Sequence, residues 1–175
     1  MNGQYEEKFP QARALYLYML CHPGKKLNFM GNEIAQFREW DEKREQDWDL
    51  LKYPNHDAFH RYITELNMIY LGNSALYADD YSTDGFEWLD CHSEEKCVYA
   101  FLRRGKKQTL LAVFNFSDKA VNYKLKLDDI SSLELLIDSN EPRFGGEYGK
   151  TVLPKIKNGT AVFNLTAFSG QVYSV

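Results

Sequence analysis

The chain has 175 residues, of which 44% are hydrophobic and 15% aromatic, so it can bury a core and is not a disordered tail. Its formal net charge of -4 at pH 7 argues against a nucleic-acid-binding surface, because binding phosphates requires clustered Lys and Arg. Its three cysteines match neither a zinc site nor a disulfide framework, and no signal peptide or membrane-spanning run is evident, so we expect a cytoplasmic protein without a membrane partner.

A helix is predicted near the start of the chain. Apolar side chains recur at helical spacing from Phe9 to Leu20, Pro10 suits the first turn, and Pro23-Gly24 ends the pattern. The next apolar run, Leu27 to Met30, is too short for another helix and is bounded by lysines and a glycine. We therefore predict that Leu27 to Met30 is a buried strand of a parallel sheet, which needs neighbouring strands.

A long loop separates this segment from a second predicted helix. The loop, residues 31–54, is longer than most connections in compact domains, which indicates a function. Helical spacing resumes from Phe59 to Tyr70, with Pro54-Asn55 at the beginning and Gly72 placed to cap the end.

Beyond Asn73 the apolar pattern alternates, and this change predicts a boundary between one domain of residues 1–73 and another of residues 74–175. The predicted strands are Val98 to Arg103, Leu110 to Phe116, Val121 to Leu127, Leu133 to Ile137, Ala161 to Leu165 and Gln171 to Val175. Asn158-Gly159 predicts a type I′ hairpin, because both of its central residues must take positive φ. Many short strands with regular turns favour an antiparallel sandwich.

The long loop mixes carboxylates with tryptophans, a combination that suits sugars. Hydroxyl groups bind carboxylates, and the apolar face of a sugar ring lies against a flat aromatic surface. The sugar-binding candidates are Glu33, Glu39, Trp40 and Trp48. The alternatives are that both tryptophans are hydrophobic anchors of the loop, and that Glu33 accepts backbone N–H groups or pairs with Arg38.

Two other residue patterns bear on possible chemistry. His56 and His60 share a helix face at the spacing of a metal half-site, but without a third ligand we predict an exposed helix face, no metal and no cofactor. Retaining glycosidase chemistry needs two carboxylates about 5 Å apart on a rigid frame. Glu33 with Glu39 or Asp47 would place such a pair on one loop, so we predict that the chain is not a complete glycosidase.

Several segments resemble the C-terminal part of bacterial 1,4-alpha-glucan (glycogen) branching enzymes of the alpha-amylase superfamily. They are Phe9 to His22, Pro23-Gly24-Lys25-Lys26, Phe29-Met30-Gly31-Asn32-Glu33, Glu39-Trp40, Asp47-Trp48 and Gly85-Phe86-Glu87-Trp88. The resemblance covers essentially the whole chain. It implies an α+β fragment, in which the last helix-strand-helix piece of a (β/α)8 barrel precedes an antiparallel all-β sandwich domain.

The resemblance also implies where the chemistry lies. The nucleophile Asp, the acid/base Glu and the third Asp of the family are expected upstream of residue 1, so no catalytic residue is assigned here. The implied partners are an α-1,4-glucan or glycogen and the missing N-terminal part of the barrel. The implied reaction transfers an α-1,4-glucan segment to a 6-hydroxyl group to form an α-1,6 branch, and the chain alone is expected to be inactive.

Two alternatives from other classes remain open, a carbohydrate-binding module and a purely structural β domain. The two alternatives predict different locations for the aromatic side chains at the start of the β region. These residues are Tyr77, Tyr81, Phe86, Trp88, Tyr99 and Phe101. These side chains either form a surface platform for glucan or pack against the barrel, and packing is favoured because a large exposed aromatic patch promotes aggregation.

Overall fold

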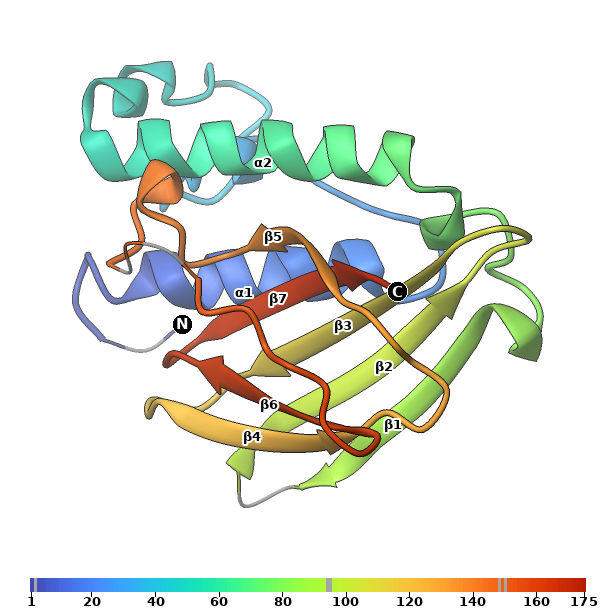
Figure 1. Ribbon diagram of the computed structural model, residues 1–175. Coiled ribbons are helices and arrows are strands. Elements are labelled where there is room, and N and C mark those ends of the chain that lie inside the picture. Colours follow the sequence, from blue (N-terminus) through green and yellow to red (C-terminus); the bar gives the residue numbers. More distant parts are fainter. Residues whose placement is uncertain (2, 94–95, 148, 150) are drawn as a thin grey trace.

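The first of two long helices lies against one face of a five-stranded antiparallel sheet, with the second helix packed on the first, and a two-stranded sheet covers the other face (Figure 1). The computed structural model describes all residues except 2, 94, 95, 148 and 150. The helices are α1 (Lys8–Cys21) and α2 (Pro54–Gly72), and the strands are β1 (Phe86–Ser93), β2 (Val98–Arg104), β3 (Thr109–Asn115), β4 (Val121–Lys126), β5 (Glu134–Asp138), β6 (Thr160–Leu165) and β7 (Ser169–Ser174). The larger sheet has the order β1-β2-β3-β7-β5, and β4 pairs with β6.

The alternating strands divide the interior into two apolar layers. In β2, Phe101 faces the helices, while Ala100 and Leu102 face β4 and β6. Neighbouring side chains of a strand point to opposite faces, so one strand contributes to both layers. The predicted antiparallel sandwich is confirmed.

The layer beneath the helices joins α1, α2 and the sheet into one core. Leu17 of α1, Tyr62 of α2 and Phe114 of β3 are fully buried in it. Gly170 of β7 permits this close approach, because a Cβ atom there would lie 2.6 Å from the Phe114 ring. The predicted division at residue 73 stays a prediction, and the helices and the sheet share this core across it.

Most of the predicted elements are confirmed. Both helices and the six strands predicted beyond Asn73 form, with ends shifted by a few residues. The turn at Asn158 and Gly159 has φ values of 50° and 67°, as a type I′ turn requires, and Lys157 and Thr160 exchange backbone hydrogen bonds across it. The predicted cap at Gly72 is wrong, because Gly72 is the last residue of α2 and the extended Asn73 follows as the cap.

The predicted strand from Leu27 to Met30 is not formed. These four residues lie in an irregular, exposed segment, and the side chain of Leu27 is 75% exposed. Among the described residues no strand runs beside this segment. A parallel strand forms only when hydrogen-bonded neighbours satisfy its backbone, so the apolar run alone does not produce a strand in this chain.

We expect the backbone amides of residues 27–30 to exchange with deuterium far faster than those of β3, because β3 is hydrogen-bonded to strands on both sides. Hydrogen exchange followed by mass spectrometry of peptides from the two segments measures this difference. Equal protection of the two segments would contradict the irregular structure of residues 27–30.

A buried arginine connects the sheet to the helical layer. The Arg103 guanidinium on β2 donates to the carbonyl of Cys21 at 2.7 Å, to the carbonyl of Gly85 at 3.2 Å and to the carboxylate of Asp80 at 2.6 Å. The Arg103 side chain is 0% exposed and that of Asp80 is 8% exposed. Because Cys21 ends α1 and Asp80 lies in the segment between α2 and β1, one side chain ties the end of α1 and that connecting segment to the sheet.

Replacing Arg103 by Ala should lower the free energy of unfolding by about 3–5 kcal/mol, because it leaves the carboxylate of Asp80 buried without its cation. Arg104→Ala is the matched control. Its partner Glu87 and Arg104 itself are about half exposed, so this loss should cost about 1 kcal/mol or less. Urea unfolding of both variants measures the difference, and equal losses would show that burial of the Arg103 pair does not matter.

Candidate functional site

The long loop is attached to the helices at its beginning. Gly31 and Ala35 adopt left-handed conformations, with φ of 82° and 52°, on either side of a short 3-10 helix, η1 (Asn32–Ile34). This turn directs Ile34 into the interior, where its side chain is fully buried. A ring nitrogen of His56 on α2 lies 2.7 Å from the carbonyl oxygen of Ile34 and anchors the turn.

The position of His56 corrects the prediction of an exposed histidine pair. His56 is 1% exposed, whereas His60 is only partly buried. With one histidine buried against the loop, the two cannot serve together as a surface half-site. In the described part of the chain no group of three or more His, Cys, Asp or Glu side chains is placed to hold a metal ion.

An ion pair closes the middle of the loop. Arg38 pairs with Asp47 at 3.0 Å, and the predicted alternative partner of Arg38, Glu33, is not the residue it bonds. The hydrogen bond to Asp47 raises the pKa of Arg38, and the hydrogen bond from Arg38 lowers the pKa of Asp47. Both effects favour the charged pair, so Asp47 is held as an ionised, hydrogen-bonded carboxylate.

Glu39 and Trp40 share an open groove of about 410 Å³. The groove is lined by Arg38, Glu39, Trp40, Asp41, Glu42 and Arg44. The Trp40 side chain is 45% exposed, and its edge packs against the ring of Phe29 with 5.5 Å between the ring centroids. Trp40 is therefore partly an anchor, as one alternative held, and partly an accessible aromatic surface beside a carboxylate.

Trp48 lies in a second open groove of about 630 Å³, whose lining includes Asp47 of the ion pair. This tryptophan begins a 3-10 helix, η2 (Trp48–Lys52), and is also 45% exposed. Asp47, Asp49 and Tyr53 line the same groove. Tyr53 is 58% exposed and was not predicted as a sugar-binding candidate. Its position directly before Pro54, the first residue of α2, was the sequence signal that could have identified it.

Glu33 stands apart from the other three candidates. It lies in η1, is partly buried and lines neither groove. Burial raises the pKa of Tyr16, and the nearby charge of Glu33 raises it further. The structure therefore places Glu33 near α1, while Glu39, Trp40 and Trp48 belong to the outer part of the loop.

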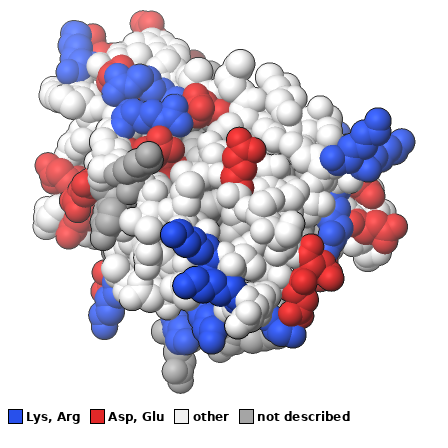
Figure 2. Space-filling model, in the orientation of Figure 1, with Lys and Arg blue, Asp and Glu red and all other residues white. Residues whose placement is uncertain are grey.

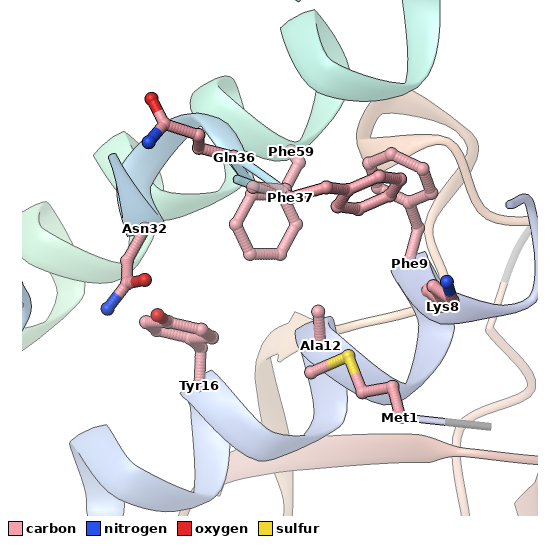
Figure 3. A pocket seen from close by; sticks show the side chains of 10 residues that line it. Met1, Lys8, Phe9, Ala12, Tyr16, Asn32, Gln36, Phe37 and Phe59 are labelled. Carbon is pink, nitrogen blue, oxygen red and sulfur yellow. The ribbon is translucent and has the colours of Figure 1, made fainter. Parts of the chain in front are cut away.

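A small cavity that no sequence pattern predicts lies between α1, the loop and α2. It has a volume of about 120 Å³. Figure 3 shows the rings of Phe9, Phe37 and Phe59 around it, with Tyr16 and Asn32 at one end. The walls are mainly apolar, so this space differs in chemistry from the two carboxylate-rich grooves.

The aromatic segment at the start of the β region is divided between packing and exposure. Phe101 is fully buried and Phe86 packs against the core beneath the helices, which confirms packing for these two residues. Trp88 is 38% exposed and Tyr81 is 83% exposed. The aromatic side chains of this segment therefore do not form one continuous exposed platform.

The charged side chains do not form an extended basic surface on the face seen in Figure 2, where Lys and Arg lie in small groups near Asp and Glu. Neither described helix combines the length and apolar character that a membrane span requires. The accessible chemistry of the loop is therefore that of aromatic rings beside carboxylates.

Comparison with known proteins gives a family for the β region. Residues 88–175 match the model of the alpha amylase C-terminal all-beta domain. The chain is 44% identical over 149 residues to the 1,4-alpha-glucan branching enzyme GlgB of Geobacillus stearothermophilus, which covers 83% of this chain and 23% of that protein. It is 49% identical over 119 residues to GlgB of Aquifex aeolicus, covering 67% of this chain and 19% of that protein.

A relative aligned over more of the chain is GlgB of Bacillus mycoides, 36% identical over 175 residues, covering 95% of this chain and 27% of that protein. The chain thus spans only between 19% and 27% of the length of these relatives.

Solved structures share the fold at low sequence identity. A debranching enzyme of Nostoc punctiforme aligns with a TM-score of 0.68 at 15% identity, covering 95% of this chain and 31% of that one. The isomaltulose synthase SmuA of Protaminobacter rubrum aligns with a TM-score of 0.61 at 19% identity, covering 94% of this chain and 38% of that one. Together with the sequence matches, these similarities establish that the chain belongs to the alpha-amylase C-terminal all-beta domain family and resembles bacterial GlgB branching enzymes.

Proposed function

We propose that this chain acts as the C-terminal part of an α-1,4-glucan branching enzyme, in which it forms one wall of the glucan cleft. The observation that carries the proposal is the loop of residues 31–53, whose half-exposed Trp40 and Trp48 lie beside carboxylates in open grooves. The names of the GlgB relatives support the substrate class, since those proteins are 1,4-alpha-glucan branching enzymes.

The distribution of exposed apolar side chains supports a role within a larger protein. Most of the large exposed ones precede the β region: Met1, Leu15, Leu27, Phe29, Met30, Phe37, Trp40, Trp48, Tyr53, Met68 and Leu71. Exposed apolar surface of this extent is typical of an interface. We propose that residues 1–73 are a barrel remnant and that the missing barrel covers part of this surface, with the apolar run at residues 27–30 as its closing strand.

The reacting groups of the proposed enzyme lie outside this chain. Retaining transfer requires a nucleophilic carboxylate and a second carboxyl group about 5 Å away as acid and base. Asp47 does not suit either role, because Arg38 binds it as an ion pair. The chain's own contribution is to bind and orient glucan, which a rigid aromatic surface does at little entropic cost.

A second candidate function is a carbohydrate-binding module that works without the rest of the enzyme. The same aromatic grooves favour it, because they are formed entirely by one loop of this chain. The two functions differ in whether glucan binding serves a reaction in the rest of the enzyme, and both differ from a purely structural β domain, which would bind none.

The isolated chain should form no branches. Incubation with amylose followed by proton NMR of the α-1,6 anomeric signal should give the same trace as buffer, because the proposal places the paired carboxylates of the reaction outside this chain. New α-1,6 linkages above the buffer value would show that the chain carries its own reacting groups.

Trp40→Ala should weaken glucan binding about fivefold, the effect of losing roughly 1 kcal/mol of aromatic contact. Native electrophoresis in gels with increasing glycogen concentration measures it, with mobility in glycogen-free gels as reference. Trp88→Ala is the control, because Trp88 is a similarly exposed tryptophan on β1. If Trp88→Ala weakens retardation and Trp40→Ala does not, the site lies on the β region.

A further inference from the structure

The ion pair in the long loop has a geometry that fixes orientation. Nη2 of Arg38 lies 3.0 Å from Oδ1 of Asp47, and Nε lies 3.2 Å from Oδ2. Nη2 also donates to the carbonyl of Glu45 at 2.8 Å. A two-pronged guanidinium–carboxylate contact sets direction as well as distance, so the two segments of the loop are held in one relative orientation.

The carboxamide of Gln36 joins the same two segments. Its Nε2 donates to the carbonyl of Arg38 at 3.0 Å, and its Oε1 accepts from the backbone N–H of Asp47 at 2.8 Å. Gln36, Arg38 and Asp47, which we call the loop clamp, thereby close residues 39–46 into a ring of fixed size. The ring contains Trp40, and Trp48 is the residue directly after Asp47 of the clamp.

The loop clamp lies between the two aromatic grooves. Arg38 lines the groove of Trp40, and Asp47 lines the groove of Trp48. Each tryptophan is 45% exposed, so packing supports only part of each ring. The clamp therefore sets the separation and the angle between two aromatic surfaces that face solvent.

We propose that the Arg38–Asp47 pair is a positioning element, which holds Trp40 and Trp48 in the arrangement that a glucan chain binds. This inference rests on the proposed glucan binding by the loop. Neither charged side chain is assigned a contact with the sugar or a catalytic role. The physical basis is preorganisation: a ligand that meets an ordered loop does not have to order it on binding, and the cost saved appears as affinity.

The alternative is an ordinary surface ion pair without influence on binding. The Arg38 and Asp47 side chains are 27% and 40% exposed, and such pairs contribute little to global stability. Loss of the pair should therefore leave the melting temperature nearly unchanged under either view. The two views differ in the expected glucan affinity of variants without the pair and in whether residues 39–46 become more accessible in them.

The test compares the wild type with Arg38→Met, Asp47→Asn and the double variant by electrophoresis in glycogen gels. Each single variant should bind about tenfold more weakly, and the double variant no more weakly than either, because the two side chains act as one unit. The control is Arg61→Met, which removes a more exposed ion pair with Asp57 on α2, outside the loop, and should bind like the wild type.

Two further readouts report on the loop itself. Trypsin should cut after Lys43 or Arg44 faster in the clamp variants than in Arg61→Met, since the ring of residues 39–46 is then open. Glycogen is uncharged, so NaCl acts on binding through the protein: retardation of the wild type and of Arg61→Met should fall with added NaCl, and that of Arg38→Met should not.

Three results would overturn the inference. Equal retardation of the wild type and the clamp variants would refute the positioning role but would still support glucan binding by the chain. An additive loss in the double variant would mean that both side chains contact glucan directly. A wild type that is not retarded at all would refute the proposed glucan binding, and the inference would fall with it.

Discussion

Attachment of the helices to the sheet depends on the buried guanidinium of Arg103. Apolar contacts hold α1 against the sheet, but the hydrophobic effect has no direction, so hydrogen bonds fix the helix position more sharply. Arg103 supplies such bonds, because its donors reach the carbonyl of Cys21 at the end of α1 and the carboxylate of Asp80. A cation at this helix end also complements the helix dipole.

A second buried arginine fixes α1 from its other side. Arg13 donates to the carbonyl of Ser139 at 2.6 Å and to that of Phe144 at 3.2 Å, both in the segment that follows β5. Burial lowers the pKa of Arg13, an electrostatic cost that these carbonyl contacts offset. With both arginines in place, α1 is a rigid base for α2, and through His56 and Ile34 for the beginning of the long loop.

The sequence predicts the elements that depend on local patterns and fails where distant neighbours decide. Helical spacing and alternation are local, so both helices, six strands and the Asn158-Gly159 turn were predictable. Whether Leu27 to Met30 forms a strand depends on neighbours that this chain does not supply. The partner of Arg38 was ambiguous for the same reason, since Glu33 is closer in sequence but the loop brings Asp47 to it.

The candidate site was predictable in composition but not in arrangement. Glu39, Trp40 and Trp48 do lie in grooves of one loop, yet the sequence could not separate the groove of Trp40 from that of Trp48. That separation results from hydrogen bonds of Gln36 and Arg38 across the loop, whose geometry depends on the left-handed turns at its root. The burial of His56 was likewise invisible without knowing where Ile34 lies.

The exposed apolar surface of the chain is of two chemical kinds, and they suit different partners. Around α1 it is largely aliphatic: Leu15, Leu27 and Met30 have 46% to 75% of their surface exposed, and such side chains gain most from burial by other apolar side chains. In the loop it is aromatic and lies beside carboxylates, and the loop clamp orders it. A polypeptide partner gains little from carboxylates that it must desolvate, whereas a sugar offers hydroxyl groups to them and a C–H face to the rings. The two kinds of surface therefore agree with the proposed function, in which polypeptide covers the aliphatic surface and the loop binds glucan.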